Sequence, residues 1–303
     1  MSNVTVEAAR RIVWPGSLGM VIACGLVTSG CSDNELLLRK NNSVAVTIGD
    51  FDEIAAPLNR MIVKHSDYDG VISTTTWDPD YDRGLSALTV EGLFGSFDEM
   101  KEHDAIFVAS GTRGFGARQY NGLEADDQIV ASPEAIENCQ NFVAGGGSLV
   151  VTDWAYDLVE AAWPEYVTFL NEGGELDAAQ RGEEGTILGT VVFTPLAEAM
   201  ETESLSLKYN FSNWAVIESV ELDKVEVLIR GDVSYLNNAG TGSDALTQAP
   251  LLVRFEPPGG LGGQVVYANF HIDAQNDFAM DQMLRTVVGR FKENDPEALA
   301  IEN

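Results

Sequence analysis

Basic residues are scarce in this 303-residue chain. It has 18 Lys and Arg against 47 Asp and Glu, a formal net charge of −29. Nucleic-acid binding needs a basic face opposite the phosphates, so this composition argues against nucleic acid as a partner. Binding to a bare anionic membrane surface is disfavoured for the same reason. The acidity fits either a saline habitat or a solvated surface that keeps a secreted protein in solution.

Cysteine is also scarce, with three residues in the chain. Cys24 and Cys31 lie near the N-terminus, so Cys139 is left alone in the remainder and no intramolecular disulfide can form there. Cys139 shares one face of a predicted helix with Ile136 and Val143. We therefore expect Cys139 to be a small core residue rather than a reactive thiol.

The chain lacks an uninterrupted hydrophobic run typical of a membrane span. Arg10 and Arg11 precede an uncharged stretch, residues 12–30, which Pro15 and several Gly interrupt. A basic start, an apolar middle and a small-residue end are typical of a secretory signal. The alternative interpretation is an N-terminal anchor helix.

The end of this stretch, residues 27–31 (VTSGC), is followed by a polar segment and resembles a bacterial lipoprotein signal. The resemblance implies cleavage before Cys31, lipidation of Cys31, and anchoring in the bacterial cell envelope, at the outer membrane or on the periplasmic or extracellular face. Residues 21–24 (VIAC) fit the same loose pattern, so Cys24 remains an alternative lipid acceptor. An ordinary cleaved signal that leaves a free thiol is a further alternative. Residues 1–30 are then the signal peptide and 31–42 a tether.

Short apolar runs alternate with helix signals over residues 43–292. We expect strands at 43–48, 70–76, 105–110, 148–152, 225–230, 251–255 and 264–270, and helices near 52–63, 96–102, 133–144, 155–162 and from about 276. This alternation predicts an α/β fold, a three-layer sandwich with a mainly parallel, flavodoxin-like sheet. It forms one domain, 43–292, with an irregular insertion at about 170–245 and an acidic C-terminal tail, 293–303.

Polar residues follow several of the predicted strands, at the edge where open parallel sheets bind ligands. Asp153, His271 and Asp273 are the candidates for chemistry, because a His beside carboxylates can orient and titrate near neutral pH. Ser110 also follows a strand at this edge. The candidates for binding are Asp50, Gly111, Thr112, Arg113, Trp154 and Gln275.

Each of these candidates also has a structural interpretation. Asp50 and Asp153 can serve only as helix caps, and Arg113 only as a loop charge. His271 can be a hydrogen-bonded structural residue. For Gly111 the functional interpretation is anion binding, because its neighbouring backbone N–H groups can face an anion.

Several aromatic residues fall on or near the predicted ligand edge: Trp77, Tyr81, Trp154, Tyr156, Trp163 and Tyr166. Aromatic faces stack on sugars and peptides, so exposed rings here favour a glycan, peptide or envelope-protein ligand. The alternative is that these rings pack in the core or under loops.

Residues 270–273 (FHID) resemble the Phe-His-x-Glu segment of class I glutamine amidotransferase-like domains. Residues 250–271 resemble the closing hairpin of the trehalose-utilisation (ThuA-like) branch of that superfamily. The resemblance implies that residues 105–111 hold the oxyanion-loop Gly and that residues 148–156 hold the nucleophile elbow.

The family's amidotransferases place a Cys at the elbow, activated by the His. This chain has Asp153-Trp154-Ala155 there, so glutamine hydrolysis by the family mechanism is not expected. The first hypothesis is a catalytically degenerate binding or interaction module on a lipid anchor. The second is a divergent hydrolase that uses Asp153, His271 and Asp273, with or without a metal. The third is a purely structural envelope lipoprotein. No cofactor is expected, and no metal site is assigned.

Overall fold

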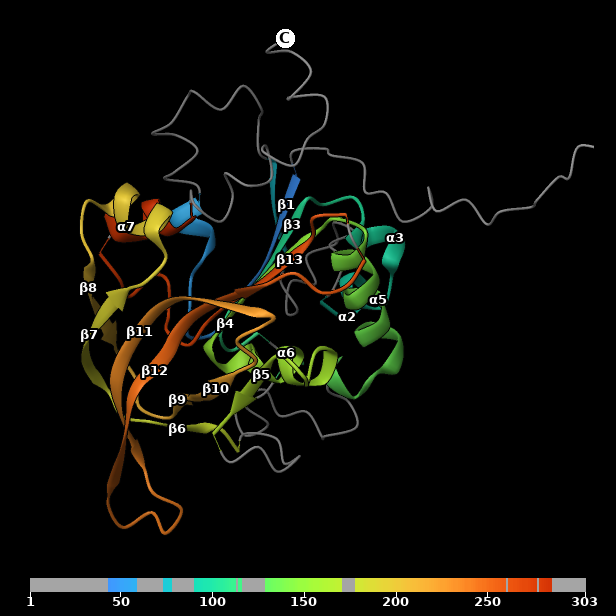
Figure 1. Ribbon diagram of the computed structural model, residues 1–303. Helices are drawn as coiled ribbons and strands as arrows, with labels where there is room; N and C mark the ends of the chain where they lie inside the picture. The colour runs from blue at the N-terminus through green and yellow to red at the C-terminus, as the bar shows by residue number, and fades with distance from the viewer. Residues whose placement is uncertain are drawn as a thin grey trace, which may run out of the picture. The chain divides into compact units, whose positions relative to one another are not determined.

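Five parallel strands lie next to one another at one end of the main sheet (Figure 1). The computed structural model describes residues 43–58, 73–77, 90–112, 114–115, 129–170, 178–259, 261–276 and 278–284. The parallel strands run in the order β2 (Ser73–Trp77), β1 (Ser43–Thr47), β3 (Ala105–Val108), β4 (Ser148–Thr152) and β13 (Gln264–Ala268). The predicted α/β class with a mainly parallel central sheet is confirmed. The segments predicted to be a signal peptide, a tether and an acidic tail lie outside the described residues.

Antiparallel strands continue this sheet beyond β13. They are β12 (Ser243–Phe255), β11 (Val225–Leu236), β7 (Gly185–Val191), β8 (Ser204–Tyr209), β6 (Gln180–Gly182) and β9 (Trp214–Ala215). The hairpin predicted for the last two strands is confirmed, because Leu252–Phe255 of β12 pairs antiparallel with β13. A separate two-stranded sheet pairs β5 (Val167–Phe169) with β10 (Ile217–Val220). The described part of the 170–245 insertion is thus mostly a β extension of the core.

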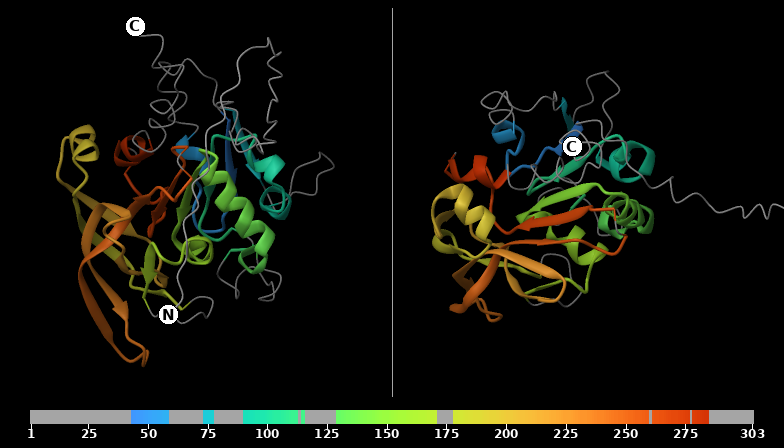
Figure 2. Two further views of the ribbon diagram at one scale, coloured as in Figure 1. Left: turned by 45° about the vertical axis from the view of Figure 1, so that its right-hand side comes forward. Right: turned by 45° about the horizontal axis from the view of Figure 1, so that its top comes forward.

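Helices cover both faces of the parallel strands (Figure 2). They are α2 (Val90–Phe94), α3 (Phe97–Met100), α5 (Pro133–Ala144), α6 (Tyr156–Ala162) and α7 (Thr194–Met200), with 3-10 turns η3 (Ile129–Ala131) and η4 (Asp153–Ala155), and helical residues at 55–58 and 278–284. In the described part of the chain, no helix is long and apolar enough to cross a membrane.

Side-chain caps begin α5 and α3. The Ser132 side chain accepts a hydrogen bond from the Ala135 N–H (3.3 Å), Pro133 occupies the first turn, and Gly145 ends the helix. Ser96 caps α3 through the Glu99 N–H (3.4 Å). Each cap satisfies an N–H that the helix itself leaves without a partner.

The first helix begins later than predicted. Helical residues start at 55 rather than near 52, so Asp50 does not cap this helix. The Asp50 and Phe51 N–H groups instead donate to the carbonyls of Gly111 (3.4 Å) and Ser110 (3.2 Å). The chain after β1 therefore joins the loop after β3 before it turns into the helix.

Alternation along the parallel strands divides the core into two layers. Val46, Phe107 and Val150 face a cluster that includes Met280 and Met283 from the last helical segment. Their neighbours along the strands, such as Ile106 and Leu149, face the cluster under α2, α5 and α6. Because side chains alternate between the faces of a strand, continuous apolar runs are required for a sheet buried on both sides.

Cys139 lies in the second of these layers and is fully buried, as predicted. Burial raises the pKa of its thiol well above the usual value. We expect Cys139→Ser to lower the free energy of unfolding by about 1–3 kcal/mol, because a hydroxyl would be buried without a designed partner. Urea unfolding measures this change. Cys139→Ala is the control for loss of the sulfur alone, and rapid labelling of the native thiol would contradict the assignment to the core.

Candidate functional site

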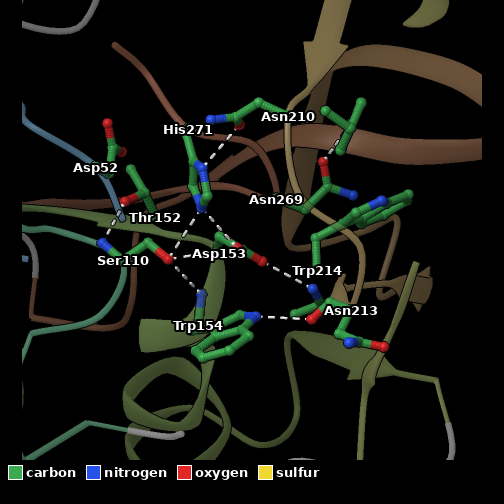
Figure 3. Close-up of polar contacts among 12 residues, drawn as sticks. Asp52, Ser110, Thr152, Asp153, Trp154, Asn210, Asn213, Trp214, Asn269 and His271 are labelled. Atoms are coloured by element: carbon green, nitrogen blue, oxygen red, sulfur yellow. Dashed lines mark hydrogen bonds and ion pairs between the residues drawn. The ribbon is translucent and has the colours of Figure 1, made fainter. Parts of the chain in front are cut away.

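Asp153 lies at a sharp turn directly after β4 (Figure 3). Its φ is 38°, in the left-handed region that non-glycine residues rarely adopt. Such a conformation costs about 1–3 kcal/mol and persists where the surroundings hold it. Here the backbone oxygen of Asp153 accepts from the Tyr267 hydroxyl (3.0 Å), and its Oδ1 accepts from the Ala215 N–H (2.8 Å). The turn is therefore fixed from both the main chain and the side chain.

His271 follows β13 and meets Asp153 inside the protein. Its Nε2 lies 2.9 Å from Asp153 Oδ2, and its Nδ1 lies 3.0 Å from Asn210 Oδ1. Both ring nitrogens face acceptors, so the imidazolium form satisfies both contacts with N–H donors. Burial lowers the pKa of His271, but the hydrogen bond to Asp153 and the charges of Asp153, Asp52 and Asp273 outweigh it and raise the pKa. The pair is thus a buried ion pair, with side chains 5% and 2% exposed.

Ser110, which follows β3, completes the cluster. Its hydroxyl lies 3.3 Å from Asp153 Oδ2 and 3.2 Å from His271 Nε2, and it accepts from the Trp154 N–H (3.4 Å). The Ser110 N–H donates to Thr152 Oγ1 (2.9 Å). A protonated Nε2 cannot take the serine proton, so the hydroxyl acts here as a donor to the carboxylate.

One segment of the insertion contacts His271, Asp153 and Trp154. Residues 210–215 follow β8 and supply Asn210 Oδ1 to His271 and the Ala215 N–H to Asp153. The carbonyl of Asn213 accepts from Trp154 Nε1 (2.7 Å). Reasoning from the sequence missed this loop, because it lies far from the site along the chain and carries no motif.

Aromatic rings lie against the cluster. Phe51 contacts Trp154 (ring centroids 4.7 Å) and Phe211 (5.9 Å), and Phe211 contacts His271 (5.6 Å). Phe211 is 48% exposed, so it covers His271 on the solvent side.

The predicted row of exposed aromatics is wrong where the structure describes it. Trp154, Tyr156, Trp163 and Tyr166 are all buried, with at most 9% of each residue exposed. They pack in the core instead of facing a ligand. Tyr81 and the side chain of Trp77 lie outside the described residues.

Two predicted binding residues have structural contacts. Thr112 is fully buried, donates to the Ala109 carbonyl (2.6 Å), and lies 2.7 Å from Thr47 Oγ1. Gln275 links Lys208 to His271: its amide oxygen accepts from the Lys208 N–H, and its Nε2 lies 2.8 Å from the carbonyls of both residues. Both residues hold the strand ends in place.

Asp50, Gly111 and Asp273 lie near the cluster. Asp50 and Asp273 are exposed, and Asp273 donates a hydrogen bond to Asp52 through its backbone N–H. Gly111 has a φ of +81°, and an added Cβ would come within 2.5 Å of the Phe51 ring. This loop therefore requires glycine. Arg113 lies outside the described residues.

Asp52, two residues beyond the predicted Asp50, is a second buried carboxyl at this edge, in addition to Asp153. Its Oδ1 accepts from the Asp273 N–H (3.1 Å), while its Oδ2 has no hydrogen-bond partner. Burial raises the pKa of Asp52 to about 6, although His271 and backbone hydrogen bonds act in the opposite direction. The sequence signal that could have found it is its place in the polar stretch that follows β1.

The described residues contain no group of three or more His, Cys, Asp or Glu side chains arranged to hold a metal ion. A groove of about 630 Å³ lies at the C-terminal end of β12. It is lined by Tyr166, Lys224, Glu226 and Arg254 among others, and it includes none of the residues predicted for catalysis or binding. Lys224 lies over the Tyr166 ring (5.2 Å), and Arg254 pairs with Glu226. Because both cations are engaged, the strand-end cluster is the better candidate site.

No known protein family matches this sequence, and no curated protein matches it. Among solved structures it is similar to the mmIFT52 N-terminal domain (9% identity, TM-score 0.46, 81% of this chain and 97% of that one). It is also similar to a ThuA-like protein from Parabacteroides merdae (11%, 0.45, 83% and 90%) and to a glutamine amidotransferase from Thermotoga maritima (9%, 0.41, 86% and 88%). At these identities the likeness concerns the fold, and function has to be argued from the site.

The raised pKa of Asp52 predicts a specific dependence of stability on pH. The folded chain binds this proton more tightly than the unfolded chain, whose carboxyl has the usual value of 3.8, so stability falls as pH rises from about 4 to about 6. His271 adds to this trend: its raised pKa stabilises the fold at low pH, and that contribution is lost as pH rises through the folded value.

We expect Asp52→Asn to remove the contribution of Asp52 to this pH dependence. That contribution is a change of at most about 3 kcal/mol in the free energy of unfolding. Urea unfolding of the wild type and the variant at pH values between 4 and 8 measures the difference. Asp50→Asn, at an exposed carboxylate of the same segment, is the matched control for loss of one negative charge. Parallel pH profiles of the wild type and Asp52→Asn would contradict the prediction.

Proposed function

We propose that this protein is a lipid-anchored cell-envelope protein whose α/β domain is a catalytically degenerate binding or interaction module. The domain has the arrangement of strand-end residues expected for an active site. Its elbow residue, however, is Asp153 rather than a nucleophilic Cys.

The observation that carries this proposal is that both oxygens of the Asp153 carboxylate already accept hydrogen bonds from within the protein. Oδ1 accepts from Ala215, and Oδ2 is in contact with His271 and Ser110. A nucleophile or general base needs a free lone pair aimed at a bound substrate. Because Asp153 and His271 are almost fully buried and paired with each other, their contacts support a stabilising role.

The second candidate is a divergent hydrolase that uses Asp153 and His271. The strained elbow and the contact of Ser110, His271 and Asp153 within 2.9–3.3 Å favour it. A catalytic role of Asp273 beside Asp153 and His271 is less well supported. Its side chain is exposed, and it contacts Asp52 through its backbone N–H. In this candidate, loop 210–215 would have to move before a substrate could reach the cluster.

A panel of ester, amide and glycoside substrates tests the two candidates against each other. We expect no turnover by the full chain above the rate of the Asp153→Asn and His271→Ala variants. His271→Ala should lower the free energy of unfolding by about 3–5 kcal/mol, because it leaves the buried charge of Asp153 without its partner. Turnover that both variants abolish, and that is independent of their stability, would establish the hydrolase.

The lipid anchor rests on the segment that ends at Cys31 and is tested separately. We expect Cys31→Ala to move the protein from the membrane fraction to the soluble fraction of the cell envelope, since one thioether-linked lipid group would be lost. Cys24→Ala is the matched control and should leave fractionation unchanged. The reverse pattern would assign lipidation to Cys24, and membrane retention in both variants would contradict a lipoprotein.

A further inference from the structure

Donors from three separate segments converge on the carboxylate of Asp153. The Ala215 N–H lies 2.8 Å from Oδ1, while His271 Nε2 and Ser110 Oγ lie 2.9 and 3.3 Å from Oδ2. An imidazolium, a hydroxyl and a backbone amide together provide a charge-assisted set of hydrogen bonds for one carboxylate group.

We propose that Ser110, Ala215 and His271 form a carboxylate-binding pocket that the chain fills with its own Asp153. The inference rests on the proposed binding function and deepens it, since it names the ligand chemistry of the site. Asp153 is then an internal ligand that keeps the pocket closed to carboxylates from outside.

Each donor has a contact that is independent of Asp153. His271 is oriented by Asn210 Oδ1 (3.0 Å), and Ser110 by its N–H bond to Thr152 (2.9 Å). Ala215 lies in β9, which pairs with Gln180 of β6. Removal of the Asp153 side chain therefore leaves a preformed pocket, and a preformed pocket binds its ligand without an ordering cost.

The backbone of Asp153 gives a second reason to regard this carboxylate as an inserted ligand. Its φ of 38° is unfavourable for aspartate and tolerated by glycine. This unfavourable φ occurs at the residue whose carboxylate it directs toward the donors of Ser110, Ala215 and His271. Glycine at this position would keep the turn and empty the pocket.

Phe211 indicates how the pocket could reach solvent. Its ring contacts His271 (5.6 Å) and Phe51 (5.9 Å) and is about half exposed. A rotation of this ring, on the loop that also carries Asn210, would uncover His271 without disturbing the parallel strands.

The test is rescue of the Asp153→Gly variant by a small carboxylate. Thermal unfolding of the full chain is followed at about pH 6, where acetate is ionised, as sodium acetate replaces sodium chloride at constant ionic strength. We expect a saturable rise in Tm of about 3–5 °C for Asp153→Gly. The wild type, whose pocket is filled, should show no saturable rise.

Two controls separate this effect from a general effect of the salt. Val151→Ala, at a fully buried residue of β4, destabilises the same strand without emptying a carboxylate site, and acetate should not rescue it. Acetamide has the shape of acetate without its charge, and it should not rescue Asp153→Gly. Equal stabilisation of all variants, or equal effects of acetate and acetamide, would overturn the proposal.

Asp153→Ala provides a second form of the test. We expect acetate to rescue it as well, from a lower starting Tm, because alanine keeps the strain of the turn. Failure of both variants to fold cooperatively in acetate would overturn the proposal, since the pocket is inferred to form without Asp153. Enzymatic turnover by the wild type would overturn the non-catalytic function and leave the rescue result unaffected.

Discussion

The buried contact between His271 and Asp153 is the interaction on which the rest of this site depends. An ion pair removed from water is tolerated only when its remaining hydrogen-bonding groups are satisfied. Here those groups are satisfied by Ser110, after β3, and by Asn210 and Ala215, from one segment of the insertion. The requirement to satisfy one pair of charges therefore joins the loops after β3, β4, β8 and β13.

The insertion has a structural task that follows from this requirement. Neighbouring parallel strands β3, β4 and β13 bring Ser110, Asp153 and His271 to one edge, but they leave His271 Nδ1 and Asp153 Oδ1 without partners. Asn210, in the loop between β8 and β9, and Ala215, in β9, supply these partners. The antiparallel extension of the sheet is what holds this loop in place, because β8 and β9 both belong to it.

The sequence predicts the parts of the fold that depend on local patterns. Continuous β-branched runs identify β1, β3 and β4, and Ser132 identifies the start of α5. The convergence of Asp153 and His271 follows from the general rule for strand ends. The contacts of Asn210 and Ala215 depend on the path of a long insertion, which no local pattern encodes. The burial of Asp52 in place of Asp50, and of Trp154, likewise depends on packing between distant segments.

The turn at Asp153 combines two unfavourable features that one set of contacts offsets. A turn with a φ of 38° costs free energy, and an aspartate there brings a second cost, the burial of its charge. Both costs are offset by one set of contacts, because the carboxylate that the turn directs inward is the partner that the imidazolium needs. The turn directs the Asp153 carboxylate toward His271, and the resulting ion pair offsets the cost of the strained turn. Loss of the ion pair would leave the strain uncompensated, and loss of the turn would leave the buried imidazolium without its partner.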